Sequence, residues 1–243
     1  MSVITLGGMS GAGARSIGPI LAEKLGSDYV DRIFLTSVAK KIGSTVAAIQ
    51  IREERIFTRS EKWLAFVQKI LETSAATGAT GDPYFGPGSS AFLLDEFEDI
   101  KGQLITEPHT IADDHYIDAV HDIMRDMAVL GDLVFVGRGG HVILNDMTNV
   151  LKVGVIAHVE DRVITLMKRE KITEPEAIKL IASRDEARRH YFDKFFNISE
   201  PDSPELYHIT INTSEVSVEY STTLILDSLN ALKDGKINSK GFN

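Results

Sequence analysis

A glycine-rich loop near the start of the chain, residues 7–13, limits most strongly what this sequence can fold into. The β-branched run Val3-Ile4-Thr5-Leu6 leads into the loop, and residues 17–26 follow it with apolar side chains at helical spacing. A strand, a glycine loop and a helix in this order place bare backbone N–H groups and the positive end of a helix around an anion. The sequence therefore predicts that this loop binds phosphate.

The glycine spacing Gly8-x-x-x-x-Gly13 is that of a Walker A loop, whose pattern continues with lysine and then serine or threonine. Here Ala14 takes the lysine position, and Arg15 follows it. The hydroxyl of Ser16, one residue further on, can reach a metal ion. The backbone cradle is thus kept, while its usual cation is missing or displaced by one residue. A glycine turn without a ligand is the alternative interpretation.

Composition narrows the class of function. The 243 residues are enough for one large domain, or for one domain with an insert. A net charge of −9 argues against general binding to nucleic acid or to anionic membranes, because both require a basic excess. The sequence has no cysteine, which excludes disulfides and thiolate metal sites. The first residues have neither a basic segment nor a long apolar core, so we expect no secretory signal and a cytoplasmic protein.

Strand and helix patterns alternate at both ends of the chain. Continuous apolar runs predict buried parallel strands at 133–136 and 150–159, and a last strand is expected at 207–212. Helical spacing covers 161–169, about 173–196 and 214–232. Helix and loop patterns fill about 42–130, including a Gly/Pro-rich stretch at 77–90. This pattern predicts an α/β fold with a parallel sheet core and a helical insertion.

Two clusters of arginine lie elsewhere in the sequence. Arg138 follows an apolar strand in a glycine turn, where the carboxyl edge of a parallel sheet binds ligands. Arg184 and Arg188 share one face of a predicted helix, and Asp185 can pair with Arg188 or Arg189. Arginines that close over transferring phosphates are one interpretation, since phosphoryl transfer depends on positive charge. A solvated helix face with ion pairs is the other.

A group of histidines and aspartates supports a different function. His115, Asp118 and Asp122 fall on one helix face, with His109 and His121 nearby. Such groups occur in metal sites, although no specific ligand spacing is present. A metal-dependent phosphohydrolase is therefore a less favoured alternative. The apolar stripe around Trp63 is typical of packing in a core or of a homodimer contact, and a homodimer is left open.

Taken in order, the glycine loop and the arginine clusters resemble the cytidylate kinase-like family of P-loop nucleoside monophosphate kinases. The residues that carry the resemblance are Gly8 to Ser16, Tyr29-Val30-Asp31-Arg32, Val136-Gly137-Arg138-Gly139, Arg184-Asp185-x-x-Arg188 and Ile211-Asn212-Thr213-Ser214. The resemblance implies a single three-layer P-loop domain over residues 1–243. A helical monophosphate-binding insert would lie at about 42–130 and a lid at about 170–205.

The resemblance also implies a reaction, in which ATP with Mg²⁺ donates its γ-phosphoryl group to CMP, dCMP or a related nucleotide. The donor phosphates would be held by the loop residues Gly8, Ser10, Gly11, Ala12, Gly13, Ala14, Arg15 and Ser16, with the hydroxyl of Ser16 on the metal. The acceptor would be bound by Asp31, Arg32 and Arg138. Arg15, Arg184 and Arg188 would serve catalysis, with Asp185 orienting the lid arginines.

Proven cytidylate kinases carry lysine where this chain has Ala14, and the kinase-like branch of the family commonly has a Gly-Gly-Arg version of the loop. Ala14-Arg15 resembles that version more closely. Three functions therefore stay open: a kinase that uses Arg15 in place of lysine, a nucleotide- or phosphate-binding protein with little or no transfer, and the metal-dependent hydrolase.

Overall fold

The computed structural model describes residues 2–31, 121–122 and 124–237. The chain divides into two compact units, one made of Met1–Arg32 and Ile123–Asn243 and the other of Ile33–Asp122. The first unit contains the sheet and the glycine loop. The Trp63 helix, the stretch 77–90 and most of the helical insert expected at 42–130 lie outside the described residues.

The first unit is built on a parallel five-stranded sheet. Its strands run in the order β2-β3-β1-β4-β5, and every neighbouring pair is parallel. Their bounds are β1 Val3–Gly8, β2 Asp28–Val30, β3 Leu133–Val136, β4 Val150–Ile156 and β5 Ile209–Asn212. The central strands are buried apolar runs, as the sequence predicted.

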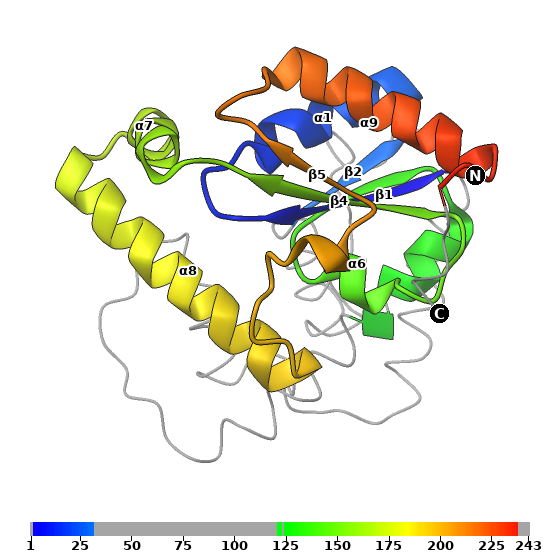
Figure 1. Ribbon diagram of the computed structural model, residues 1–243, viewed down its shortest axis with the longest axis horizontal. Coiled ribbons are helices and arrows are strands. Elements are labelled where there is room, and N and C mark those ends of the chain that lie inside the picture. Colours follow the sequence, from blue (N-terminus) through cyan, green and yellow to red (C-terminus); the bar gives the residue numbers. More distant parts are fainter. Residues whose placement is uncertain (1, 32–120, 123, 238–243) are drawn as a thin grey trace, which may run out of the picture. The chain divides into compact units, whose positions relative to one another are not determined.

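Helices cover both faces of this sheet, so the predicted three-layer α/β fold is confirmed (Figure 1). The helices of the described residues are α1 Ala14–Leu25, α6 Gly140–Ile143, α7 Val159–Glu170, α8 Glu174–Phe196 and α9 Val218–Lys233, with a 3₁₀ turn at Pro204–Leu206 and further helical residues at 121–122 and 124–130. α1 and α9 lie on one face, where their apolar side chains join those of β1 and β4 in one core. Members of that core include Ile4, Leu6, Ile17, Leu21, Val153, Ile225 and Leu229.

Local sequence signals set where the helices begin. Thr173 and Glu176 form the predicted capping box at the start of α8, with Pro175 in the first turn. The expected strand at 150–159 ends at Ile156, since α7 begins at Val159. The last helix begins at Val218 rather than at residue 214, because the Ser217 hydroxyl caps it by accepting the Tyr220 N–H.

The glycine loop lies at the carboxyl edge of the sheet, at the point where the strand order reverses. β1 sits between β3 and β4, and the chain builds β2 and β3 on one side of it before β4 and β5 on the other. Ligands in open parallel sheets bind at such a switch point. The fold therefore places residues 8–13 where a ligand is expected.

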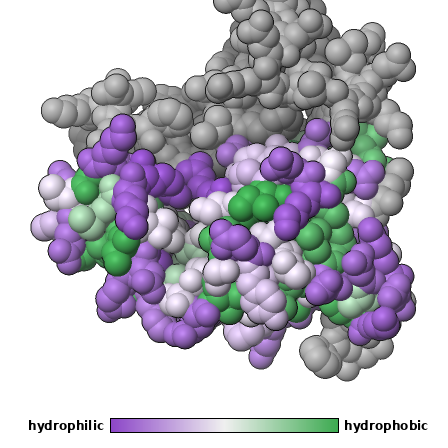
Figure 2. Space-filling model, turned by 90° about the horizontal axis from the view of Figure 1, so that it is seen from above, coloured by the Kyte–Doolittle hydropathy of each residue, from purple (hydrophilic) through white to green (hydrophobic). Residues whose placement is uncertain are grey.

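The surface on the α1 and α9 side is mixed in character. Figure 2 shows hydrophobic atoms in separate small groups among hydrophilic ones on this face. Among the described residues, no helix combines the length and hydrophobicity required to cross a bilayer.

Candidate active site

Three glycines give the loop its shape. Gly8, Gly11 and Gly13 have φ values of 128°, 84° and 100°, which L residues rarely adopt. At Gly8 the approach of the backbone is also decisive, because an added Cβ would lie 1.9 Å from the Val155 carbonyl oxygen on β4. The loop therefore requires glycine at this position both for conformation and for space.

Backbone hydrogen bonds curl the loop onto the start of α1. The Met9 N–H donates to the Val155 carbonyl at 3.2 Å, and the Ala12 N–H donates back to the Met9 carbonyl at 3.1 Å. Gly13 then serves as the N-cap residue, and Ala14 and Arg15 open the helix. This is the geometry of an anion cradle at the positive end of a helix dipole.

Two buried arginines contact the loop from other helices. Arg162 on α7 has a side chain that is 5% exposed, and its Nε donates to the Ser10 carbonyl at 2.7 Å. Arg184 on α8 is 8% exposed, and its Nη1 lies 3.5 Å from the Ser10 hydroxyl and 3.7 Å from the Glu170 carboxylate. Positive charge therefore surrounds a loop that has no lysine of its own.

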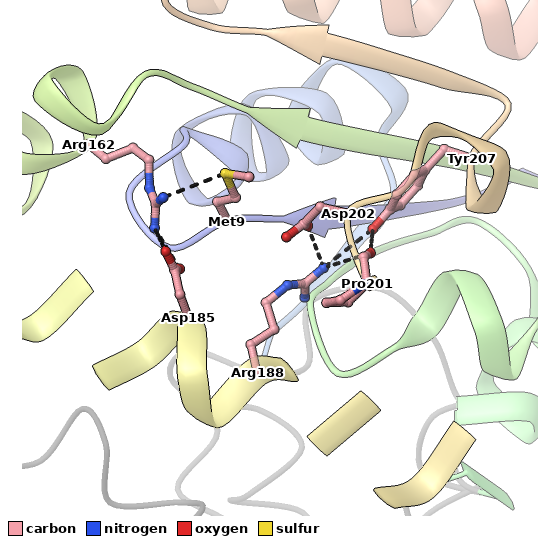
Figure 3. A network of polar contacts seen from close by, with 7 residues as sticks. All are labelled: Met9, Arg162, Asp185, Arg188, Pro201, Asp202 and Tyr207. Atoms are coloured by element: carbon pink, nitrogen blue, oxygen red, sulfur yellow. Dashed lines mark hydrogen bonds and ion pairs between the residues drawn. The ribbon is translucent and has the colours of Figure 1, made fainter. Parts of the chain in front are cut away.

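Asp185 pairs with Arg162 rather than within its own helix. Both carboxylate oxygens accept from Arg162 Nη2, at 2.6 and 2.8 Å (Figure 3). The expected pairing of Asp185 with Arg188 or Arg189 is wrong: Arg189 pairs with Glu186, and Arg188 reaches another segment. Arg162 takes precedence because its guanidinium is buried and requires a carboxylate nearby.

Arg188 is held on the segment that follows α8. Its Nη2 donates to the Asp202 carboxylate at 2.8 Å, to the Pro201 carbonyl at 3.2 Å and to the Tyr207 hydroxyl at 3.4 Å (Figure 3). The guanidinium also stacks 4.7 Å from the centre of the Phe192 ring. Its Nε is buried and has no hydrogen-bond partner in the described part of the chain.

Arg15 and Ser16 stand in the first turn of α1. Arg15 is half-buried, and Ser16 is exposed to solvent. Burial acts to raise the pKa of Glu170 at the end of α7, but the hydrogen bond from Arg169 and the charges of Arg169, Arg184 and Arg15 outweigh it, so the pKa lies below its ordinary value. The Arg15 charge therefore acts in the same region as that of Arg184.

Arg138 lies at the carboxyl edge of the sheet. It follows β3 in a left-handed turn with φ 55°, and the Tyr191 hydroxyl donates to its carbonyl at 3.4 Å. Its Nη2 is buried and finds no hydrogen-bond partner among residues 2–31, 121–122 and 124–237. Asp31 directly follows β2 at the same edge of the sheet, while Arg32 lies outside the described residues.

The buried rings of Tyr207 and His141 lie beside this edge of the sheet. Tyr207 packs over Gly7 and Gly154 on adjacent strands, where an added Cβ would come within 2.7 and 2.9 Å of its side chain. The His141 ring stacks on Tyr207 at 4.5 Å. Burial lowers the pKa of His141 to about 3, and the charges of Arg188 and Lys152 act in the same direction. His141 is therefore a neutral, structural histidine at pH 7.

Several residues of this region were not singled out by the sequence. Arg162 lies in an ordinary helical pattern, Asp202 follows the expected helix without any motif, and Tyr207 was noted only as the first residue of the expected last strand. Thr213 was noted only as part of the late Ile211-Asn212-Thr213-Ser214 segment, although its hydroxyl donates to the Ala12 carbonyl at 2.7 Å. The nearest signal was the expected last strand at 207–212, since the carboxyl ends of parallel strands lie at the edge of the sheet where the glycine loop stands.

The metal-hydrolase alternative falls mostly outside the described residues, because His109, His115 and Asp118 are not among them. Within the described ranges, no group of three or more His, Asp or Glu side chains is arranged to hold a metal ion.

Known proteins resemble this chain in sequence and in fold. The sequence matches the cytidylate kinase-like family over residues 3–215. A shikimate kinase from Chlorobium phaeovibrioides is 36% identical over 81 residues, which make up 33% of this chain and only 39% of the length of that protein. An uncharacterized protein from Eubacterium ventriosum aligns over 95% of this chain and 99% of its own, with 16% identity and a TM-score of 0.61, and shares the fold. A shikimate kinase from Bacteroides thetaiotaomicron aligns over 94% of this chain and 98% of its own, with 14% identity and a TM-score of 0.45.

Proposed function

The chain belongs to the cytidylate kinase-like family, and we propose that it transfers the γ-phosphoryl group of ATP, bound with Mg²⁺, to CMP, dCMP or a related small acceptor. The observation that carries this proposal is the loop at residues 8–13. Its three left-handed glycines and the N-terminus of α1 form a phosphate cradle at the switch point of the sheet.

The donor phosphates would lie in this cradle, contacted by the backbone of residues 8–16. Arg15 enters from the first turn of α1, and the buried Arg184 approaches the Ser10 hydroxyl from α8. Arginine presents a planar fork that suits phosphate oxygens, so these side chains can supply charge that a lysine would otherwise supply. Asp185 acts through Arg162, which it holds against the loop.

The acceptor would bind beyond the ends of β2 and β3. Arg138 supports this, because its buried Nη2 lacks a partner among the described residues, and an anionic acceptor group would satisfy it. Asp31 stands at the end of the neighbouring strand, and Arg32 is proposed to act with it. Arg188, with its buried and unpaired Nε, would meet the phosphate in transfer.

The chemistry of the loop fits Mg²⁺ through one hydroxyl. Magnesium usually keeps several waters and takes only one or two protein ligands beside substrate phosphates. Ser16 is exposed in the first turn of α1 and offers such a ligand. When bound, the metal would neutralise charge on the phosphate oxygens.

A second function is favoured by one observation. Ala14 leaves the loop without its own cation, and two arginines of the region are already engaged by carboxylates, Arg162 by Asp185 and Arg188 by Asp202. A protein that binds nucleotide or phosphate with little or no transfer is therefore the alternative, ahead of the metal-dependent hydrolase.

Transfer of labelled γ-phosphate from ATP·Mg²⁺ tests these functions. The acceptor panel contains CMP, dCMP, UMP, AMP and GMP, with shikimate added because of the curated relative. Arg15→Ala, Arg138→Ala and Arg188→Ala are expected to lose transfer while remaining folded. Arg125→Ala is the matched control, since it removes an exposed ion pair with Asp146 and leaves the site unchanged.

The outcomes separate the three functions. Transfer to one acceptor that is lost in the three site variants supports the kinase. Bound ATP without transfer to any acceptor supports the binding protein. Activity that survives the arginine variants and disappears in His115→Ala supports the hydrolase and overturns the proposal.

A further inference from the structure

Two carbonyl groups of the loop are held by side chains from distant parts of the chain. Arg162 Nε on α7 donates to the Ser10 carbonyl at 2.7 Å. The Thr213 hydroxyl, just after β5, donates to the Ala12 carbonyl at the same distance. These residues lie 152 and 201 positions along the chain from the groups they bind.

Because the peptide bond is planar, a contact that fixes a carbonyl group also fixes the direction of the N–H that follows it. In a trans peptide the C=O and the following N–H point in opposite directions. Holding the Ser10 carbonyl toward Arg162 directs the Gly11 N–H away from Arg162, and holding the Ala12 carbonyl toward Thr213 directs the Gly13 N–H away from Thr213. Among the described residues, neither N–H donates to an acceptor. Both are therefore available to an anion in the loop.

Glycine makes this fixation necessary. Gly11 and Gly13 have φ values of 84° and 100°, and glycine can occupy many other backbone conformations at little cost. A loop of this composition would otherwise lose conformational freedom on binding, which weakens affinity. A side chain that fixes each peptide plane beforehand removes that loss.

Both donors are themselves fixed. Arg162 is 5% exposed, and its remaining nitrogens contact Asp185 and the Met9 sulfur, the latter at 3.5 Å (Figure 3). The Thr213 N–H donates to the Ile156 carbonyl at 2.9 Å, and the Thr213 hydroxyl oxygen lies 3.2 Å from the same carbonyl oxygen. Neither donor can turn away without breaking a second contact.

We propose that Arg162 and Thr213 are positioning residues, which hold the Gly11 and Gly13 amides toward the phosphates of the bound nucleotide. This inference rests on the proposed function and deepens it, because it says how a loop with Ala14 in place of lysine binds phosphate. Because Asp185 on α8 shares Arg162, the orientation of the cradle is also coupled to α8.

The test measures binding of inorganic pyrophosphate and of ATP·Mg²⁺ to the full chain by titration calorimetry. Thr213→Val removes the hydroxyl at nearly constant volume, and Arg162→Lys removes the Nε donor while keeping the charge. Each is expected to weaken pyrophosphate binding about tenfold, the effect of one lost hydrogen bond of about 1.4 kcal/mol. Thr213→Ser keeps the hydroxyl and is expected to restore the affinity.

Matched controls separate orientation from general stability. Thr222→Val removes a buried hydroxyl that donates to the Val218 carbonyl within α9, away from the loop. Arg125→Lys changes an exposed ion pair in the same way as Arg162→Lys changes the buried one. Both controls are expected to bind pyrophosphate like wild type. Amide resonances of Gly11 and Gly13 should shift with pyrophosphate in wild type and shift less in Thr213→Val.

The possible results distinguish the positioning role of Arg162 and Thr213 from the proposed function. Wild-type affinity in both Thr213→Val and Arg162→Lys overturns the positioning role and leaves the proposed function standing. Equal losses in Thr213→Val and Thr222→Val also overturn it, because the loss is then one of stability. A wild-type protein that binds neither pyrophosphate nor ATP·Mg²⁺ overturns the proposed function, and the positioning role with it.

Discussion

Replacing Gly8 with alanine perturbs the loop where its geometry is tightest. The new methyl group would lie 1.9 Å from the Val155 carbonyl oxygen, on a backbone with φ 128°. The strained φ costs on the order of 1–3 kcal/mol. Relieving the overlap separates β1 from β4 and breaks the hydrogen bond from the Met9 N–H, which costs about 1 kcal/mol more, besides lost packing. We expect the free energy of unfolding to fall by about 2–4 kcal/mol.

Gly235→Ala is the matched control for this change. Gly235 also has a positive φ, of 70°, but an added Cβ meets nothing within 4 Å. It should therefore show the backbone cost alone, on the order of 1 kcal/mol. Urea unfolding followed by circular dichroism compares the two variants with wild type. If Gly8→Ala were no less stable than Gly235→Ala, the close approach of the loop to β4 would be refuted.

Three further predictions concern the surroundings of the site. Burial lowers the pKa of His141 to about 3, so the folded protein resists protonation that the unfolded chain accepts below pH 6.5. The folded protein therefore has its full stability above pH 6.5, and its free energy of unfolding decreases by up to about 1.4 kcal/mol per pH unit as the pH falls from 6.5 toward 3. His141→Gln should flatten this pH dependence of the free energy of unfolding, measured with urea. Thr173→Ala removes the capping box of α8 and should lower the melting temperature in calorimetry by about 2–4 °C, for about 1 kcal/mol. Arg188→Lys loses the Nη2 that contacts Asp202, Pro201 and Tyr207, and hydrogen exchange of residues 201–207 should become faster by about tenfold.

Local patterns were sufficient to predict the layers of the fold. The apolar runs at 133–136 and 150–156 are buried parallel strands, and the Thr173 capping box begins α8 as expected. The errors lay at the ends of helices and strands, because a single capping residue can set where a helix begins. Ser217 starts α9 later than apolar spacing alone predicted, because its hydroxyl accepts the Tyr220 N–H. Helical periodicity does not register such a cap.

The site was predicted only in the part that is contiguous in the sequence. The glycine loop between β1 and α1 was predicted from its glycine spacing, and the family resemblance was confirmed over residues 3–215. The partner of Asp185 was missed, because spacing within one helix favoured Arg188 or Arg189 whereas the fold presents Arg162 from α7. No local pattern distinguishes Arg162 from a surface arginine, since its burial depends on how α7 and α8 pack.

If the loop binds phosphate as proposed, the same packing explains how it can do so without a lysine. In a Walker A loop the cation belongs to the loop itself, so its position follows from the local backbone. Here Arg162 and Arg184 contact Ser10 from α7 and α8, and these helices are joined by their own apolar cluster, which includes Leu166 and Ile181. The charge near the loop therefore depends on the position of a helix pair. A shift of α8 would change the contacts of Arg184 directly and those of Arg162 through Asp185, so the proposed phosphate binding would depend on the position of α8 through the same side chains.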